Sequence, residues 1–443
     1  MNEQSSVCVI GAGISGLTSI KKLVDGGHTV VCFEMGSDVG GLWRYDNDNG
    51  RSPAYASLHI DTSKRRFEFS DFAAPKQWDP YLHHTQVLEY LEAYAAAFDL
   101  KDLVRFRRRV VQVKPEGERW SVEVEDLESG STSIDVYDAV VVASGHHWDP
   151  NMPTHQGEFG GEILHAQEYR TPDQFIGKNV VVVGLGNTGA DIACELSWHA
   201  KSVTLSTRSG AHVLPRYLLG RPLDTFSSRA SSRLPLSVQR FVYRALLVST
   251  RGSQASYGVP TPDAPLLSQH PTVSQDLLRL AKEEHISVKG DISRLSGTEV
   301  IFANGDAVPA DVIIYATGYN ITFPFLSEDV VEVRDNKTDL FNMVVPADVQ
   351  GLYFVGLIQP VGALPPLAEQ QARWVAQLIG GAALPSHGEM LAEIVVDTFE
   401  RQKQYLDAPR HTIQVDYWPY LDHMRKLCDA NDAVNARVAS STD

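Results

Sequence analysis

Two stretches of the chain repeat the same order of apolar and polar positions. Each begins with a short apolar run, Val7–Ile10 in the first and Asn179–Val183 in the second, and continues through a glycine-rich turn into a segment of helical periodicity. A second apolar run then follows, ending at Phe33 and at Leu205. Short uninterrupted apolar runs are typical of strands buried on both faces of a parallel sheet. The repeat therefore predicts two strand–turn–helix–strand units in an α/β fold.

The first glycine turn has the spacing of a dinucleotide-binding motif. Gly11 allows a tight turn, Gly13 lets the backbone approach a pyrophosphate, and Gly16 lets the following helix pack on the strand. The N-terminus of that helix suits an anionic phosphate. Glu34 ends the second apolar run about 20 residues later, where a carboxylate accepts ribose hydroxyls. This unit therefore predicts an FAD site.

The second glycine turn reads Gly184-Leu185-Gly186-Asn187-Thr188-Gly189. A helix over Ala190–His199 and a strand over Ser202–Leu205 are expected after it, and the strand leads into Ser206-Thr207-Arg208 where the first unit has Glu34. A carboxylate there would repel a ribose 2′-phosphate, whereas an arginine pairs with one. The turn and Arg208 therefore predict an NADPH site.

Periodicity predicts several further elements. Apolar residues at helical spacing indicate an amphipathic helix over His84–Phe98. Alternation within 109–136 indicates a small antiparallel meander, an insertion often found in flavin domains. The Asn304-Gly305 dipeptide favours a hairpin with a type I′ turn over Thr298–Ile314. A strand over Gly351–Gly356 and a helix over Glu369–Ile379 are expected to complete the first domain.

The stretch at about 217–269 is the least regular. After Pro235 it carries apolar residues at helical spacing, with arginines on the far side. The apolar positions are Val238, Phe241, Val242, Ala245 and Leu246, and the arginines are Arg240 and Arg244. A basic amphipathic helix can lie on a membrane surface or on a partner. Packing against its own domain is the interpretation we favour, because most such stripes belong to a core.

Together these elements predict two Rossmann-like dinucleotide-binding domains, with the FAD domain interrupted by the NADPH domain. The first part of the FAD domain is expected over 1–170. The NADPH domain is expected over 171–299, including the irregular insert at about 217–269, and the completing part of the FAD domain over 300–443.

Composition adds limits to this picture. The chain has 443 residues, enough for two or three domains, and 43% of them are hydrophobic. The net charge of −16 argues against nucleic-acid binding. The four cysteines show no paired spacing, which favours a reducing, cytoplasmic setting. We expect no signal peptide, no membrane anchor and no metal site. The oligomeric state stays open, with a homodimer as one option.

Between the two glycine turns the segment 159–169 fits the pattern F-x-G-x-x-x-H-x-x-x-Y at Phe159, Gly161, His165 and Tyr169. The chain thereby resembles the flavin-containing monooxygenase family, and within it the soluble, microbial-type members. The related Baeyer–Villiger fingerprint ends in Trp followed by Pro or Asp, where this chain has Tyr169-Arg170.

The resemblance covers nearly the whole chain and implies an NADPH- and dioxygen-dependent oxidoreductase of the EC 1.14.13 type. In this family a C4a-hydroperoxyflavin oxygenates soft nucleophiles, so the resemblance implies N- or S-oxidation of small amines or sulfides. Besides the residues above, it implies a further set of cofactor-binding positions. They are Ser15, Gly41, Leu42, Trp43, His59, Thr62, Val111, Gly145, Thr317, Gly318, Gln359 and Gln370.

One position departs from the family pattern. The family has Asn in S-L-x-x-N-(T/S)-x-K, and the corresponding segment here, Ser57–Lys64, has Asp61. The resemblance implies that this catalytic position faces the flavin. An amide donates a hydrogen bond at any pH, whereas a carboxyl group donates only when it is protonated. Burial would favour the protonated form, and nearby Lys64 would oppose it. The alternative role for Asp61 is a turn residue that bonds its own backbone.

Two other functions stay open at this point. Asp61 and the shared flavin chemistry allow a Baeyer–Villiger-type oxidation of ketones. A non-catalytic protein that senses its cofactor is an alternative from another class. The substrate itself is not encoded in any motif.

Overall fold

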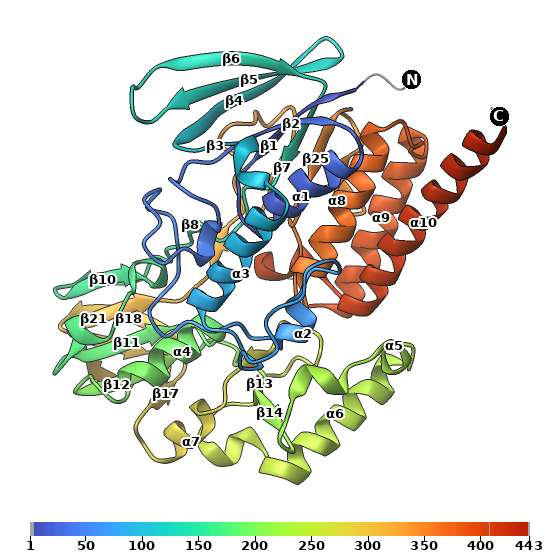
Figure 1. Cartoon of the computed structure of the whole chain (residues 1–443). Helices are drawn as coiled ribbons and strands as arrows, with labels where there is room; N and C mark the ends of the chain where they lie inside the picture. The colour runs from blue at the N-terminus through green and yellow to red at the C-terminus, as the bar shows by residue number, and fades with distance from the viewer. Residues whose placement is uncertain (1–3, 407, 442–443) are drawn as a thin grey trace. The chain divides into compact units, whose positions relative to one another are not determined.

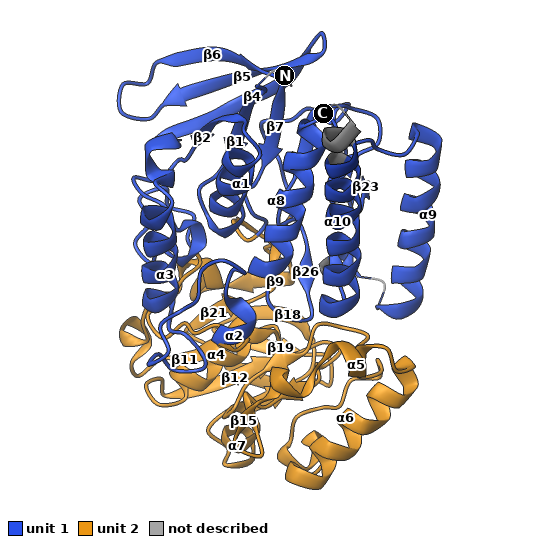
Figure 2. Ribbon diagram, turned by 45° about the vertical axis from the view of Figure 1, so that its right-hand side comes forward, with its two compact units in different colours: residues 1–52, 64–146, 321–443 blue, residues 53–63, 147–320 orange. Residues whose placement is uncertain are grey.

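The computed structural model describes residues 4–406 and 408–441 (Figure 1). By its internal contacts the chain forms two compact units (Figure 2). Unit 1 comprises residues 1–52, 64–146 and 321–443, and unit 2 comprises residues 53–63 and 147–320. Among the described residues, no helix has both the length and the apolar composition that crossing a bilayer requires.

Unit 1 contains a five-stranded sheet in the order β25-β7-β1-β2-β3, and all its pairings are parallel. The strands are β1 (Ser6–Ile10), β2 (Thr29–Phe33), β3 (Val104–Arg105), β7 (Ala139–Val142) and β25 (Leu352–Phe354). Helices α1 (Ile14–Asp25) and α8 (Pro365–Ile379) pack against each other beside this sheet (Figure 1). The predicted first unit and its closing helix are therefore confirmed.

Unit 1 also contains the predicted amphipathic helix and the meander. The helix is α3 (His84–Ala97), and the meander consists of β4 (Arg108–Glu116), β5 (Arg119–Asp126) and β6 (Thr132–Tyr137). Its remaining elements are α2 (Lys64–Phe67), α9 (His387–Gln404), α10 (Tyr417–Ser441), β23 (Leu340–Phe341), β24 (Val345–Pro346), β26 (Gln359–Pro360) and β27 (Gln414–Val415).

Unit 2 has its own five-stranded parallel sheet in the order β10-β21-β11-β12-β17. The strands are β10 (Glu162–His165), β11 (Asn179–Val183), β12 (Ser202–Ser206), β17 (Ser287–Lys289) and β21 (Val312–Tyr315). Helices α4 (Asn187–Leu196) and α7 (Leu277–Lys282) contribute leucines and Ile192 to the core of this unit. The second predicted glycine-turn unit is thus also confirmed.

The units divide at 146/147 and 320/321, whereas the sequence predicted 170/171 and 299/300. The reason is strand pairing: β10, which belongs to the fingerprint segment, pairs with β21, and β21 pairs with β11. Residues 53–63 also belong to unit 2, because the Ala56 N–H donates to Arg170 O at 2.8 Å.

The hairpin prediction was wrong in its extent and turn type. Only β19 (Glu299–Phe302) and β20 (Ala307–Pro309) form the hairpin, and β21 joins the parallel sheet instead. Gly305 has φ +88°, but Asn304 has no positive φ, and a type I′ turn needs both. The hairpin extends into a four-stranded sheet with β18 (Ile292–Gly297) and β9 (Gln156–Phe159).

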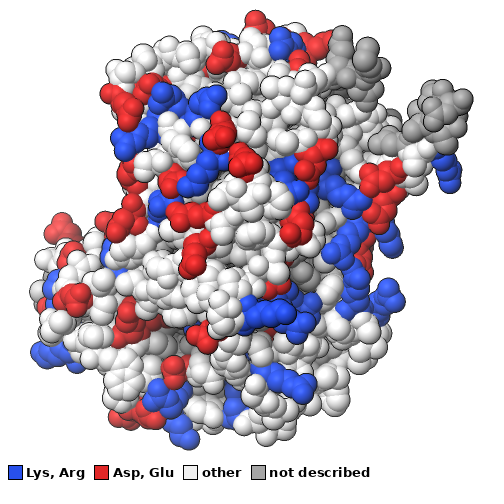
Figure 3. Space-filling model, in the orientation of Figure 1, with Lys and Arg blue, Asp and Glu red and all other residues white. Residues whose placement is uncertain are grey.

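The irregular insert contains two helices, α5 (Arg229–Ser232) and α6 (Leu236–Arg251). It also contains the short strand pair β14 (Tyr217–Leu218) and β15 (Arg221–Pro222). A second short pair, β13 (Val213–Leu214) and β16 (Thr272–Val273), flanks the insert. Another short pair in unit 2 is β8 (Asp149–Pro150) with β22 (Tyr319–Asn320). Our expectation that the apolar stripe packs on its own domain was wrong for most of α6. Phe241 and Val242 are exposed. At the lower right of Figure 3, where α6 lies in Figure 1, uncharged residues (white) and Lys or Arg (blue) make up most of the surface.

Candidate functional site

In unit 1 the first glycine turn joins the end of β1 to α1. Gly11 has φ +96°, a conformation that favours glycine, and a Cβ on Gly16 would lie 1.8 Å from the Gly11 carbonyl oxygen. A Cβ on Gly13 would meet only the Gly41 Cα, at 3.7 Å. Gly11 and Gly16 are therefore required by the protein's own packing, whereas the space beside Gly13 is open to a ligand.

Glu34 follows β2 and is buried against this turn. One carboxylate oxygen accepts the Ala12 N–H at 2.8 Å, and the other accepts the Gly36 N–H at 2.7 Å. Each carboxylate oxygen can accept a further hydrogen bond, so these two bonds orient the group and leave capacity for ribose hydroxyls. Glu34 thus has a structural role in addition to the one expected from the sequence.

Several other predicted positions of unit 1 lie around the same turn. The Gly40 N–H donates to Ala12 O at 3.0 Å, which brings the Gly41-Leu42-Trp43 segment to the turn. Gly356 returns from the C-terminal part, and a Cβ on it would lie 2.0 Å from Ser15 Oγ. Gly145 lies three residues after the end of β7. Ala143, the first residue after β7, donates its N–H to Ile10 O at the end of β1, which brings this segment to the turn. The structure therefore gathers segments that are far apart in sequence at the carboxyl end of β1.

Three more predicted positions of unit 1 have distinctive environments. Val111 lies where the pairing of β4 with β5 shifts register, so it is left out of the ladder. Gln359 begins β26 and donates its N–H to Ile413 O at 2.8 Å. Gln370 is buried in α8, and its Oε1 has no hydrogen-bond partner among the described residues. A buried acceptor without a donor is a group that a bound ligand can satisfy.

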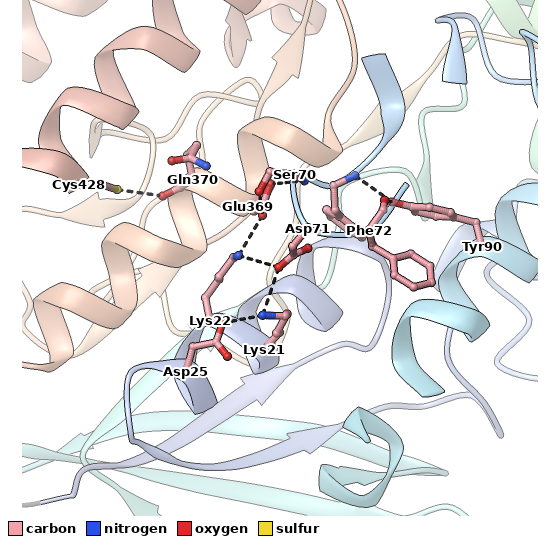
Figure 4. A network of polar contacts seen from close by, with 11 residues as sticks. Lys21, Lys22, Asp25, Ser70, Asp71, Phe72, Tyr90, Glu369, Gln370 and Cys428 are labelled. Atoms are coloured by element: carbon pink, nitrogen blue, oxygen red, sulfur yellow. Dashed lines mark hydrogen bonds and ion pairs between the residues drawn. The ribbon is translucent and has the colours of Figure 1, made fainter. Parts of the chain in front are cut away.

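Glu369, beside Gln370, ties three segments of unit 1 together (Figure 4). It is 1% exposed, and one oxygen lies 2.9 Å from the Lys22 ammonium of α1. It also accepts hydrogen bonds from the Ser70 N–H at 2.9 Å and from the Ser70 hydroxyl at 2.6 Å. These contacts hold α8 to the helix that follows the first glycine turn.

In unit 2 the second glycine turn repeats the geometry of the first. Gly184 has φ +115°, and a Cβ on Gly189 would lie 2.0 Å from the Gly184 carbonyl oxygen. A Cβ on Gly186 would meet no atom within 4 Å. Each turn thus places its middle glycine beside open space, as a pyrophosphate-binding turn requires.

The end of β12 shows which residue of unit 2 occupies the position that Glu34 has in unit 1. Gly11 N–H donates to Phe33 O and Gly184 N–H donates to Ser206 O, so the counterpart of Glu34 is Thr207 and not Arg208. Thr207 is buried, and its hydroxyl oxygen accepts the Gly210 N–H at 3.1 Å. Arg208 is the next residue and is exposed. A neutral residue therefore replaces the carboxylate, and the arginine stands beside it.

The fingerprint residues have structural roles within unit 2. His165 Nε2 donates to Gly318 O at 3.0 Å while its Nδ1 accepts the Gln167 N–H at 3.1 Å, and burial lowers the pKa of His165. Thr317 donates its hydroxyl hydrogen to Asn151 O at 2.6 Å. Tyr169 is fully buried and donates to Glu195 of α4 at 2.7 Å. The fingerprint thus connects β10, α4 and the segment after β21.

Asp61 lies in a half-buried polar cluster of unit 2, beside the second glycine turn, and its side chain is 29% exposed. The amide of Asn187 donates a hydrogen bond to its carboxyl group, and Asn187 Oδ1 accepts the Val273 N–H at 2.8 Å. Arg216 Nη2 lies 3.8 Å from Asp61 Oδ1 and 3.5 Å from Asp191 Oδ2. Tyr55 donates to Asp191 at 2.9 Å. Asp61 therefore bonds α4 rather than its own backbone.

The charges of this cluster do not balance. Two carboxyl groups face one guanidinium, so the proximity of like charges favours one of them being protonated. Burial, followed by the charge of Asp191, raises the pKa of Asp61, while Arg216 and Asn187 oppose this shift. Burial also raises the pKa of Asp191, against the effects of Arg216 and Tyr55. Burial and the neighbouring carboxyl group together favour the protonated form of Asp61.

His59 and Thr62 flank Asp61 in the same segment. His59 Nδ1 donates to Ser57 O at 2.7 Å, and the next residue after Thr62, Ser63, donates its N–H to Asp224 at 2.6 Å. These bonds hold the segment 57–63 in unit 2.

The comparison with known proteins bears on this geometry. The family model "Flavin-binding monooxygenase-like" matches residues 4–438. The chain belongs to the flavin-containing monooxygenase family. It is 40% identical to flavin-containing monooxygenase 5 of Rattus norvegicus, over 96% of this chain and 82% of that protein. It is 36% identical to dimethylaniline monooxygenase [N-oxide-forming] 2 of Rattus norvegicus, over 94% and 81%.

Solved structures agree on the fold. S-allyl-L-cysteine S-oxygenase from Allium sativum matches with a TM-score of 0.73 and 25% identity, over 96% of this chain and 89% of that one. An open structure of cyclohexanone monooxygenase matches with a TM-score of 0.69 and 18% identity, over 96% and 98%. The chain is therefore an NADPH-dependent flavin-containing monooxygenase that uses FAD and NADPH. The open space beside Gly13 and Gly186 and the unpartnered Gln370 Oε1 fit such cofactors.

The family resemblance did not reveal Tyr55, Asp191 or Arg216. Asp191 lies four residues after Asn187 on α4, so helical spacing places both on one face, and this signal was available in the sequence. Arg216 lies between β13 and β14, immediately before the irregular insert, where no periodicity marks it. Only the folded chain shows that it reaches two carboxyl groups.

Proposed function

We propose that this monooxygenase transfers one oxygen atom of dioxygen to a soft nucleophile, the nitrogen of a small amine or the sulfur of a sulfide. In this proposal FAD binds at the first glycine turn of unit 1 and NADPH binds at the second glycine turn of unit 2. Flavin reduced by NADPH supplies the activation of dioxygen, and the protein supplies binding, orientation and fixed dipoles.

The observation that carries the proposal is the position of Asp61, which bonds Asn187 at the start of α4 and lies beside Arg216, with Asp191 raising its pKa. Oxygen transfer to a nitrogen or sulfur lone pair leaves negative charge on the atom that the oxygen departs from, and a hydrogen-bond donor there lowers the barrier. Asp61 held neutral beside Asp191 can donate such a bond, as the family's amide does. The substitution of Asn by Asp therefore preserves the donor instead of abolishing it.

The other residues bind and orient. Glu34 orients a ribose and Arg208 pairs with a 2′-phosphate. Asn187 fixes Asp61 to the start of α4. Two similar proteins support the substrate class, because one is an N-oxide-forming dimethylaniline monooxygenase and the other is an S-oxygenase.

A second candidate, the oxidation of ketones, rests on Arg216. A ketone carbon is electrophilic and needs the nucleophilic, deprotonated form of the oxidant, which a nearby cation stabilises. Arg216 lies 3.8 Å from Asp61 Oδ1 and could supply that cation. Asp61 and Arg216 thus favour opposite chemistries, and the protonation state of Asp61 decides between them.

The test is a screen of substrate-dependent NADPH oxidation with amines, sulfides and ketones of matched size, with the products identified by mass spectrometry. We expect N-oxides or S-oxides at higher kcat/KM than any ester or lactone. Esters or lactones as the main products would favour the second candidate. NADPH oxidation that yields only H₂O₂ with every class would contradict both.

A further inference from the structure

Helix α6 presents an apolar face that none of the described residues covers. Val238, Phe241, Val242 and Val248 recur at helical spacing, and their exposed fractions are 41%, 72%, 52% and 49%. The opposite face of the helix packs through Leu247, which contacts Leu214 and Leu266 in a small core of unit 2. Packing of α6 on its own unit is therefore complete without the exposed face.

The charge around this face is of one sign. Between Asp224 and Asp263 the sequence contains no acidic residue and five arginines, although the whole chain carries −16. The five are Arg229, Arg233, Arg240, Arg244 and Arg251. Arg240 donates to Leu266 O at 2.7 Å, and Arg251 donates to Val213 O, so these two hold the helix to the unit. Arg233, three residues before α6, and Arg244, on α6, are both exposed.

A second exposed apolar face shows that exposure alone does not explain α6. On α9, Val395, Val396 and Phe399 are 68%, 58% and 56% exposed. The same helix carries four acidic residues, Glu389, Glu393, Asp397 and Glu400, against Arg401 and Lys403, so its net charge is acidic although Lys403 lies over the Phe399 ring. The α6 face is both apolar and basic, and the α9 face is apolar and acidic. The two faces therefore suit different surroundings.

The charge also selects among occupants of the α6 face. A second copy that docked its own α6 against this one would bring arginines against arginines, which is unfavourable at short distance. An anionic lipid surface complements both properties at once. It accepts aromatic and aliphatic side chains at the boundary between headgroups and acyl chains, and it attracts arginines to its phosphates.

We propose that α6 lies in the plane of an anionic lipid surface, with Phe241 and Val242 inserted among the headgroups and with Arg233 and Arg244 beside lipid phosphates. Helix α6 then attaches this enzyme reversibly to a membrane without spanning it. Because each arginine near an anionic surface contributes about a fivefold gain in partitioning, attachment depends on lipid charge and weakens as salt screens it. This inference does not depend on the proposed substrate class.

The test is sedimentation of the FAD-loaded full-length protein with vesicles. One set contains phosphatidylcholine with about 30 mol % phosphatidylserine, and the other contains phosphatidylcholine alone. We expect the wild type to pellet with the anionic vesicles at about 0.1 M salt and to be released at about 0.5 M salt. We expect Phe241→Ser with Val242→Ser, and separately Arg233→Gln with Arg244→Gln, to lower binding at least tenfold.

The matched control is Val396→Ser with Phe399→Ser on α9, which removes a similar apolar area from acidic surroundings and should leave vesicle binding unchanged. NADPH oxidation without vesicles should be the same in all variants, which shows that they are folded. The proposal is overturned if the wild type stays in the supernatant with anionic vesicles, or if the α9 variant loses as much binding as the α6 variant. A dimer that the α6 variant loses while vesicle binding is unchanged would also overturn it.

Discussion

Single residues of the two glycine turns fall into two physical classes. Gly16 and Gly189 face a carbonyl oxygen at a distance where no Cβ fits, so the protein itself requires them. A Cβ on Gly13 would make only an ordinary contact with Gly41, and one on Gly186 would meet no atom within 4 Å, so the protein itself tolerates a methyl group at both positions. Glu34 belongs to the first class, because it holds two backbone amides as well as any ribose. The middle glycines therefore offer the cleaner test of the cofactor sites.

We predict that Gly13→Ala folds but purifies with less FAD than the wild type, and that Gly186→Ala keeps its FAD but raises KM for NADPH at least tenfold. The added methyl group occupies the approach of the pyrophosphate in each case. Flavin absorbance per protein and steady-state kinetics measure the two effects. Each variant is the control for the other, and a Gly13→Ala protein with full flavin content and unchanged affinity would contradict the FAD assignment.

We predict that Arg208 sets the preference for NADPH over NADH. Loss of one charge-assisted hydrogen bond to the 2′-phosphate costs about 1.5–3 kcal/mol, or about one to two powers of ten in the ratio of kcat/KM for the two cofactors. Arg208→Ala should lower kcat/KM by this factor with NADPH and leave kcat/KM with NADH unchanged. Lys201→Ala, at the opposite end of the same strand region, is the control. A ratio that Arg208→Ala leaves intact would assign the phosphate to other residues.

The pH dependence of coupling tests the polar cluster around Asp61. A carboxyl group with a raised pKa stays protonated, and so remains a donor, up to a higher pH than an ordinary one, and it loses the proton as the pH rises further. We predict that the H₂O₂ released per NADPH rises with pH in the wild type and stays low in Asp61→Asn, whose amide does not titrate. The measurement covers about pH 6 to about pH 9.

Asp191→Asn provides a second arm of that experiment. Because the Asp191 charge raises the pKa of Asp61, its removal should move the rise in H₂O₂ release to lower pH. Asn187 also bonds Asp61, so a change in KM for NADPH in Asp61→Asn would be consistent with the structure. Identical pH profiles in the wild type and in Asp61→Asn would remove Asp61 from the reaction.

Among the elements, α8 is held to α1 by a buried charge rather than by apolar packing alone. Glu369 bonds Lys22 and Ser70, and it is almost fully buried (Figure 4). Removing one partner of such a pair leaves the other charge without compensation. The attachment of α8 to α1 therefore depends on the Glu369 carboxylate.

We predict that Glu369→Ala lowers the free energy of unfolding of unit 1 by about 3–5 kcal/mol and weakens FAD retention with it. Urea unfolding followed by flavin fluorescence measures both effects. Glu369→Gln, which keeps an acceptor for Ser70, should lose less stability. Glu400→Ala, which breaks the exposed pair with Lys403, should cause little change. Equal stability of Glu369→Ala and Glu400→Ala would show that the buried pair does not contribute.

At the scale of the whole molecule, the chain alternates between its units, and residues 53–63 enter unit 2 before unit 1 is complete. We predict that FAD and NADP⁺ protect different units from hydrogen exchange. FAD added to the deflavinated protein should slow exchange at 11–17 and 34–43, and NADP⁺ added to the holoenzyme should slow exchange at 184–190 and 207–210. Mass spectrometry of peptides resolves these regions. Protection of the second turn by FAD would reverse the assignment.

The sequence by itself determined the two glycine-turn units, the meander, the amphipathic helix 84–97 and the family. These features are local: a strand, its turn and the next helix carry their periodicity and spacing within about 30 residues. The same locality explains the errors. Asn304-Gly305 marked a real turn, but whether 312–315 continues the hairpin or joins the parallel sheet depends on pairing with distant β10 and β11. The compact units also divide at other residues than the predicted domains, because these long-range pairings join segments that are distant in sequence.

Only the tertiary structure decided how distant side chains share charge and what covers each helix face. Arg216, between β13 and β14, meets Asp61 and Asp191, and the resulting excess of one carboxyl group favours the protonated form of Asp61. Apolar periodicity identified α6 as amphipathic, but Leu247 alone of that helix is fully buried, and Phe241 and Val242 stay exposed. Periodicity reports the faces of a helix, and the face that becomes core depends on contacts with residues such as Leu214 and Leu266.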